Sequence, residues 1–273
     1  MSTHKHRDIP RFNTPLIETH CHLDYLDQEQ LQQTLTRSQE AGIERIITIA
    51  VSPGNLDKVW KLSHTHSNVW GSQGIHPHEA EAWDESIGDT IREYASSERT
   101  LAIGEIGLDY FYDHADRKIQ LRVFEEQLEI AAQLDLPVII HTREADEDTR
   151  AILANHTHRL KRRGVIHSFT SGLALAHYCL SEDFMLGFNG ITTFNRADNV
   201  REVVAITPPE QLLLETDAPY LTPVPYRGKP NAPYFLPFIA EKIADIKQLE
   251  VEAMLQQIYH NSLRLFFPNE QQG

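Results

Sequence analysis

Two histidines at alternate positions are the first residues in this sequence whose type and spacing could do chemistry. His20 and His22 end an apolar run that begins at Leu16. Because side chains alternate between the two faces of a strand, His20 and His22 should point the same way and Cys21 the opposite way. Two neutral imidazoles on one face can bind a divalent cation of intermediate softness. Two ordinary surface histidines at a strand end would give the same pattern, and the chain has 15 histidines.

Short apolar runs bounded by turn residues indicate the elements that would position this pair. Eight such runs predict strands, at residues 16–23, 45–51, 69–75, 101–106, 137–142, 164–169, 184–189 and 212–217. Patterns between and after them predict helices, at residues 27–41, 55–64, 84–95, 117–135, 146–155, 197–206 and 234–246. The helix at 117–135 has the clearest amphipathic stripe, with Leu121, Phe124, Leu128, Ala131 and Leu134 at spacings of three and four.

Eight alternating strand and helix units predict a single-domain α/β fold, a (β/α)8 TIM-like barrel. A doubly wound open sheet is the alternative architecture. It is disfavoured because no glycine-rich phosphate loop follows the first predicted strand. We expect the barrel to occupy residues 15–273, with residues 1–14 as a flexible N-terminal extension.

Ionisable residues end five of the eight predicted strands. They are His20 and His22 on the first strand, Glu105 on the fourth, His141 on the fifth, His167 on the sixth and Asp217 on the eighth. In a barrel these strand ends converge on one face, where such folds carry their chemistry. A single buried histidine or paired carboxylate has ordinary structural explanations, but six at one face favour a metal site.

Four imidazoles and two carboxylates exceed what one tetrahedral ion can use, so the count predicts two divalent ions. Glu105 is the expected bridge, because its strand lies between the other ligands in barrel order. His20 and His22 with Asp217 would serve one ion, and His141 with His167 the other. Mixed nitrogen and oxygen ligation favours zinc, manganese, iron or nickel, and also admits loosely held magnesium.

Composition limits the partners and the location. The 273-residue chain has a formal net charge of −14, which opposes broad phosphate attraction, so a nucleic acid would be held locally at the metal ions. Two distant cysteines, Cys21 and Cys179, fit a reducing cytoplasm. No apolar run approaches the roughly 18 residues that span a bilayer, so we expect a soluble cytoplasmic protein without a membrane partner, and a monomer by default.

Several polar residues near the strand ends are candidates for binding substrate. Arg143 should share the face of His141 and contact phosphate, and a surface ion pair with a neighbouring carboxylate is the alternative. Arg227 and Lys229 follow the last strand in a loop that could meet a backbone phosphate or be merely solvated. His78 could bind phosphate or protonate a leaving oxygen, whereas a structural role beside the ligands is the alternative for it and for His76.

Other residues near the strand ends are expected to support the site. Asp109 should orient ligands or loops, and Glu215 should be a hydrogen-bonded structural carboxylate. The aromatic residues at 110–112 could stack nucleobases, although aromatic clusters usually belong to a core.

The chain resembles the TatD family of metal-dependent deoxyribonucleases, within the amidohydrolase-like metal-dependent hydrolases. The resemblance covers about residues 16–267 and is carried by these motifs: Thr19-His20-Cys21-His22-Leu23-Asp24, Gly74-Ile75-His76-Pro77-His78, Gly104-Glu105-Ile106-Gly107-Leu108-Asp109-Tyr110, Pro137-Val138-Ile139-Ile140-His141, Ile166-His167-Ser168-Phe169, Glu215-Thr216-Asp217-Ala218-Pro219-Tyr220-Leu221 and Pro225-Tyr226-Arg227-Gly228-Lys229. The resemblance implies that the metal-binding residues of the family correspond to the same six residues that end the predicted strands: His20, His22, Glu105, His141, His167 and Asp217.

This resemblance implies a distorted barrel, a binuclear divalent centre and stepwise hydrolysis of single-stranded DNA from a 3′ end. Metal-activated water would attack phosphorus, with Asp217 accepting a proton and Glu105 bridging the ions. Some relatives act on other esters, so a D-aminoacyl-tRNA deacylase is the alternative. Two positions depart from the family pattern: Ala232 stands where Glu or Gln is frequent, and the order Asn195-Arg196 is reversed.

Overall fold

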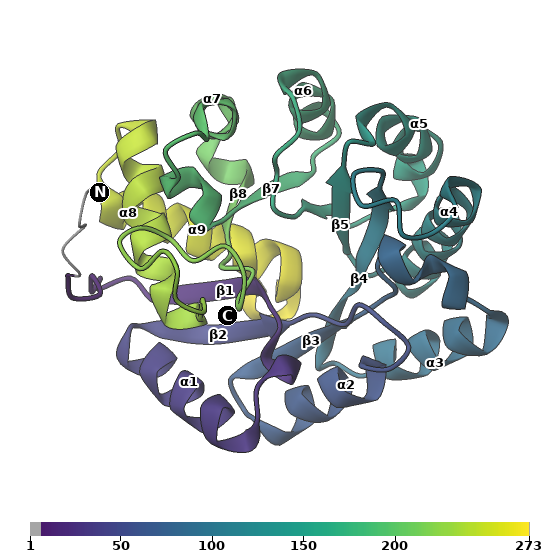
Figure 1. Ribbon diagram of the computed structural model, residues 1–273, viewed down its shortest axis with the longest axis horizontal. Coiled ribbons are helices and arrows are strands. Elements are labelled where there is room, and N and C mark those ends of the chain that lie inside the picture. The colour runs from purple at the N-terminus through teal and green to yellow at the C-terminus, as the bar shows by residue number, and fades with distance from the viewer. Residues whose placement is uncertain (1–6, 273) are drawn as a thin grey trace.

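Eight parallel strands run in sequence order around the centre of the molecule, and helices surround them (Figure 1). We describe a computed structural model of the chain, which covers residues 7–272. The strands are β1 (Leu16–Cys21), β2 (Ile43–Thr48), β3 (Val69–Gln73), β4 (Thr100–Asp109), β5 (Val138–Arg143), β6 (Gly164–Ile166), β7 (Met185–Phe188) and β8 (Leu212–Leu214). Each strand pairs in parallel with the next from β1 to β8, which confirms the predicted eight-stranded α/β barrel.

Nine α-helices flank these strands in the described part of the chain. They are α1 (Gln28–Glu40), α2 (Leu56–Thr65), α3 (Glu85–Ala95), α4 (Arg117–Leu134), α5 (Asp146–His156), α6 (Leu173–Ser181), α7 (Asp198–Ile206), α8 (Leu236–Lys247) and α9 (Val251–Phe266). Seven of them confirm predicted helices, whereas the patterns considered above do not predict α6 and α9. No helix within residues 7–272 is long and apolar enough to cross a bilayer.

The first and last strands meet at the seam of the barrel. The Thr19 hydroxyl donates to the Leu214 carbonyl at 2.7 Å. Just beyond the strand ends, the Asp217 amide donates to the His20 carbonyl at 2.9 Å and the His22 amide to the Ala218 carbonyl at 2.8 Å. The seam therefore brings the first pair of predicted ligands beside the last one.

The apolar side chains form two layers, as alternation along the strands requires. One residue from almost every strand faces the barrel interior, for example Ile17, Ile47, Ile139 and Leu213. The end of α9 and Phe267 pack against this inner layer. The second, larger layer lies between the strands and the surrounding helices. The barrel interior is thus filled, which leaves the carboxyl ends of the strands as the open face.

Helix α4 shows how local sequence signals produce these elements. The Asp116 side chain caps its first turn by accepting the Lys118 amide at 2.9 Å. Phe124, Leu128 and Ala131 are buried against the sheet, as their spacing predicts. The helix ends where Asp135 adopts a left-handed conformation with φ of 57°.

Strand β4 extends to Asp109, beyond the predicted end at residue 106, so Glu105 lies inside the strand. Strands β6 and β8 are shorter than predicted, and His167 and Asp217 lie in the loops that follow them.

The segment from residue 7 to residue 14 contacts the barrel. Arg7 pairs with Glu241 on α8, and the Asn13 amide donates to Glu252 on α9 at 2.7 Å. Residues 1–6 of the predicted extension lie outside the described residues.

Candidate metal centre

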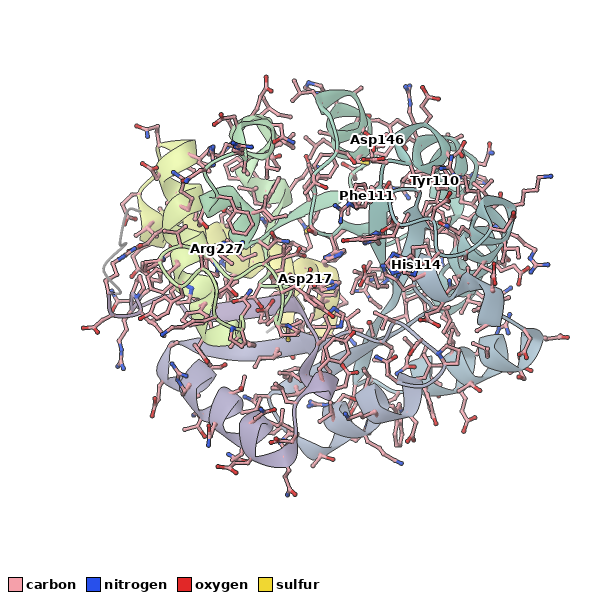
Figure 2. The ribbon with its side chains drawn as sticks, viewed as in Figure 1. Tyr110, Phe111, His114, Asp146, Asp217 and Arg227 are labelled. Atoms are coloured by element: carbon pink, nitrogen blue, oxygen red, sulfur yellow. The ribbon has the colours of Figure 1, made fainter. Side chains whose placement is uncertain are left out.

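All six predicted ligands converge at the carboxyl ends of the strands. They come from β1, β4, β5, the turn that follows β1 and the loops that follow β6 and β8. Asp217 lies toward the middle of the ring of helices in Figure 2. The barrel therefore assembles side chains that lie up to 197 positions apart in the sequence.

Glu105 is the hub of this cluster. Its Oε1 lies 3.0 Å from His141 Nδ1, 3.1 Å from His167 Nε2 and 3.5 Å from His76 Nε2. Its Oε2 lies 3.3 Å from His20 Nε2. Burial would raise the pKa of Glu105, but the surrounding imidazoles outweigh burial and hold its pKa well below the usual range. The carboxylate is therefore ionised and faces nitrogens on several sides.

Asp217 contacts two histidines, His20 and His22, at the seam between β1 and β8. Its Oδ1 lies 3.4 Å from His22 Nε2 and 3.6 Å from His20 Nε2. Its backbone is left-handed, with φ of 56°, a conformation that aspartate tolerates better than most side chains. Burial would raise the pKa of Asp217, but the hydrogen bond to His22 and the nearby imidazoles lower it. Asp217 is thus a second ionised oxygen donor.

His20 supplies the observation that best tests whether a metal fits. Its side chain is buried, and within residues 7–272 neither ring nitrogen makes a hydrogen bond of good geometry, although Nε2 lies 3.3 Å from Glu105 Oε2 and 3.6 Å from Asp217 Oδ1. Burial and the parallel ring of His167, 3.7 Å away between centroids, lower the pKa of His20. A buried imidazole nitrogen that faces two carboxylate oxygens without a well-formed hydrogen bond is costly unless a cation binds among these atoms. The donor set therefore fits a divalent metal.

The ligand atoms fall into three overlapping groups. His20, His22 and Asp217 form the set expected for the first ion. His141 groups with Glu105 and His76, and His167 groups with Glu105 and His20. His141 and His167 both face Glu105 Oε1, so their expected pairing around one ion stays a prediction. His76, which was not among the predicted ligands, is a candidate ligand. The sequence signal that could have identified His76 is the pair of histidines in the motif Gly74-Ile75-His76-Pro77-His78, which follows β3.

Asp109 holds His141 from the side opposite Glu105. Its Oδ2 lies 2.8 Å from His141 Nε2 and 3.2 Å from His78 Nε2. Burial would raise the pKa of Asp109, but its hydrogen bonds to these histidines lower it, so the carboxylate only accepts. His141 must then carry its proton on Nε2, which leaves Nδ1 free to bind a metal. Asp109 therefore orients a ligand, in agreement with the sequence interpretation.

Glu215 does the same for His167. Its Oε1 accepts the Ser168 amide at 2.7 Å and lies 3.1 Å from His167 Nδ1 and from Asn189 Nδ2. The Nε2 of His167 is thereby left to face Glu105. The hydrogen-bonded role predicted for Glu215 is confirmed by these contacts.

A cavity of about 670 Å³ opens above the candidate metal ligands. His78 and Arg143, two of the predicted substrate contacts, line it. Arg143 stacks over Phe111 at 3.9 Å from the ring centroid, and not on a neighbouring carboxylate. The lining contributed by residues 7–272 does not include Arg227 or Lys229. A substrate contact by these four side chains stays a prediction.

Arg227 and Lys229 fold back onto their own loop region. Arg227 lies 3.9 Å from the Phe194 ring centroid and donates to the Thr222 carbonyl at 2.9 Å. Lys229 Nζ lies 5.6 Å from the Tyr226 ring centroid. Ala232, one of the two departures from the family pattern, is buried beside Phe235.

Known proteins resemble this chain over nearly its whole length. A family model of TatD related DNases matches residues 17–267. The uncharacterized metal-dependent hydrolase YabD of Bacillus subtilis is 34% identical, over 92% of this chain and 98% of its own length. The 3′-5′ ssDNA/RNA exonuclease TatD of Pantoea ananatis is 34% identical, over 86% of this chain and 92% of its own length.

A solved structure agrees with these sequence matches. The TatD homologue YjjV from Escherichia coli K12 superimposes with a TM-score of 0.87 at 30% identity, covering 92% of this chain and 97% of that chain. The predicted TIM-like barrel and metal-dependent hydrolase are thereby confirmed. The chain belongs to the family of TatD related DNases.

Proposed function

We propose that the protein is a metal-dependent exonuclease that hydrolyses single-stranded DNA from the 3′ end. The observation that carries the proposal is the Glu105 carboxylate, which faces imidazoles from several strands at the floor of an open cavity. Family membership and the exonuclease activity named for the Pantoea ananatis relative support the same reaction. A phosphodiester fits this site because its negative charge would be drawn to metal ions in an otherwise acidic protein.

We propose two divalent ions per chain. Glu105 would bridge them, because its two oxygens face different imidazoles. His20, His22 and Asp217 would hold one ion, and His141 and His76 the other, with His167 beside the bridge. The nitrogen and oxygen donors favour zinc, manganese, iron or nickel over magnesium.

The chain's own residues would divide the reaction among them. The metal ions, when bound, supply an acidic water and stabilise charge on the phosphoryl group. Asp217, ionised and open to the cavity, accepts the proton that the attacking water loses. Arg143 and His78, on the cavity wall, would contact the phosphate oxygens.

End-labelled DNA tests the proposal directly. Manganese-reconstituted protein is offered single-stranded DNA labelled at either end, the matching duplex and D-aminoacyl-tRNA. We expect mononucleotides to be released from 3′ ends of the single strand. Asp217→Asn should lower kcat by at least about 100-fold, because it removes the proton acceptor.

The control is Asp116→Asn, which changes a carboxylate at the start of α4, away from the metal ligands. Near-normal activity of Asp217→Asn would remove that residue from the mechanism. Cleavage of the aminoacyl ester with intact nucleic acid would overturn the nuclease assignment in favour of a deacylase. A cytoplasmic location and a monomeric state remain predictions.

A further inference from the structure

Exposed aromatic side chains gather at the mouth of the cavity. Within residues 7–272, six large apolar side chains are exposed: Tyr25, Phe111, Tyr112, Tyr220, Ile206 and Leu249. Tyr25, Tyr112 and Tyr220 line the cavity, and Phe111 precedes Tyr112. Exposed apolar side chains that gather in one place often mark a binding surface, whereas isolated ones are common. Because the exposed aromatic side chains gather around one opening, they indicate a ligand with flat, apolar faces.

Tyr25 and Tyr220 form the first aromatic wall. The Tyr25 ring lies parallel to His22, with 5.1 Å between centroids and 9° between planes. Tyr220 packs edge-on against Tyr25 at 6.3 Å. This wall adjoins the His22–Asp217 contact at the barrel seam. A planar group stacked here would lie directly beside the metal ligands.

Phe111 and Tyr112 form the second aromatic wall. Their rings are perpendicular and 4.9 Å apart, and the Arg143 guanidinium lies over both. Asp109 Oδ1 accepts both backbone amides, at 3.1 Å for Phe111 and 2.9 Å for Tyr112. The same carboxylate therefore fixes this wall and orients His141, which places the wall firmly relative to the metal centre.

The two walls lie on opposite sides of the barrel mouth. Tyr25 follows β1 and Tyr220 follows β8, whereas Phe111 and Tyr112 follow β4. Because the strands are in sequence order, β4 lies across the ring from β8. In Figure 2, Phe111 lies on the side of α4 and α5, while Asp217 lies nearer the middle. The metal ligands are thus flanked by one wall on each side.

We propose that the two aromatic walls are base-stacking subsites that hold the nucleobases on either side of the scissile phosphate. The inference rests on the proposed nuclease function and specifies how that site would recognise its substrate. A phosphate at the metal centre has one nucleoside on each side, which matches one wall on each side. Aromatic side chains stack any base, so the arrangement suits sequence-tolerant binding of a single strand.

A neighbouring acidic groove indicates which wall takes the terminal nucleoside. Arg143 and Thr170 line both the cavity and a groove of about 750 Å³. The groove is also lined by four carboxylate side chains, Glu144, Asp146, Glu147 and Asp148, which outnumber its two cations, Arg117 and Arg143. These carboxylates would repel further phosphates. The second aromatic wall, beside the groove, should therefore hold the terminal nucleoside, and the remaining strand should leave past the first wall.

Substrates that lack a single base test both parts of the proposal. Metal-loaded protein is offered single-stranded DNA with an abasic residue at either the last or the next-to-last position. Each abasic residue should raise the KM of the native protein by about 10-fold, through loss of one stacked base. Tyr112→Ala should raise the KM for intact DNA by a similar factor, with no further penalty from a terminal abasic residue. Tyr220→Ala should behave in the same way toward the next-to-last position.

The chain offers matched controls for these variants. Leu249→Ala removes another exposed apolar side chain, one that lies outside the cavity lining, and should leave KM unchanged. Tyr112→Phe and Tyr220→Phe keep the ring and should raise KM less than the matching alanine variants do. The alanine variant and the matching abasic residue could each raise KM by factors that multiply when the two are combined. The side chain and the base would then act independently, which would overturn the stacking contact between them. If Tyr112→Ala removed the penalty at the next-to-last position and Tyr220→Ala removed the penalty at the last position, the assignment of the terminal subsite would be overturned.

A binding assay separates this inference from the nuclease proposal. Phosphorothioate-linked DNA with 2-aminopurine at the terminal position is titrated with metal-loaded protein, and stacking should quench its fluorescence. If the native protein cleaves no DNA, the nuclease proposal fails, and quenching that is lost in Tyr112→Ala would still support the terminal base subsite. Absence of quenching by the native protein would overturn that subsite.

Discussion

Replacing Asp109 by asparagine should disable one metal ligand without touching it. Asp109 Oδ2 lies 2.8 Å from His141 Nε2, and its Oδ1 accepts two backbone amides. An asparagine side chain can keep the amide contacts through its oxygen, but its NH2 group would then face Nε2 of His141. His141 would have to accept there and move its proton to Nδ1, the nitrogen that faces Glu105.

The expected loss follows from this change of tautomer. Groups that orient a histidine ligand typically contribute about 10- to 100-fold in metal affinity, or about 1.4–2.8 kcal/mol. We expect Asp109→Asn to weaken manganese binding within that range. Because the two backbone contacts are preserved, the metal-free variant should unfold at nearly the native denaturant concentration.

Calorimetric titration of chelator-treated protein with manganese measures the affinity, and urea denaturation measures stability. Asp116→Asn is the matched control, since this carboxylate also accepts backbone amides but is not among the contacts of the ligand histidines. Native affinity in Asp109→Asn would refute the tautomer argument. A large loss of stability in the metal-free variant would show instead that Asp109 acts mainly on the fold.

Three further predictions concern the site and the strand that carries it. Glu105→Gln should retain fewer ions than the native protein, because Glu105 faces imidazoles from several elements; elemental analysis counts the ions, and two per chain would contradict the bridge. Burial would lower the pKa of His141 and His167, but nearby carboxylates outweigh it and raise both, so protons persist on them above the ordinary histidine range. Manganese affinity should therefore fall as pH drops from about 8 to 5.5 and should release protons on binding; calorimetry in buffers of different ionisation enthalpy measures this, and constant affinity would contradict it. Gly107→Ala should cost about 3 kcal/mol or more of unfolding free energy, because its Cβ would lie 1.9 Å from the His141 carbonyl oxygen at a φ of 139°. Chemical denaturation tests this against Gly172→Ala, where a Cβ would meet nothing within 4 Å, and equal stabilities would show that the strand accommodates the methyl group.

Strand periodicity is sufficient to predict most of the barrel. Apolar runs identify all eight strands within a few residues, because the strands of a parallel barrel are buried on both sides. Helix α6 escapes prediction, since Leu173–Ser181 is apolar almost throughout and shows no clear stripe. Helix α9 does have a periodic signal, with Met254, Leu255 and Ile258 buried on one face, but it follows the eighth unit and adds no strand.

The convergence of the six candidate metal ligands is predictable from the sequence, whereas their division between two ions stays a prediction. Strand ends place the six side chains on one face, whereas their division between ions depends on ring orientations that sequence spacing does not fix. His76 shows this limit, because β3 ends at Gln73 and a 3-10 helix begins at Pro77. His76 therefore lies in an irregular segment to which strand parity does not apply. Asp109 was placed near the site, but its contact with His141 required the extra length of β4.

The candidate metal ligands on the two sides of the seam between β1 and β8 are synthesised at different times. His20 and His22 leave the ribosome early, but Asp217 follows almost two hundred residues later and meets the His20 carbonyl only through the closed barrel. A nascent or truncated chain that ends before Asp217 carries the histidine pair without its carboxylate. If His20, His22 and Asp217 hold an ion as proposed, that ion would bind only after the last strand has docked, and metal occupancy would then report completed folding.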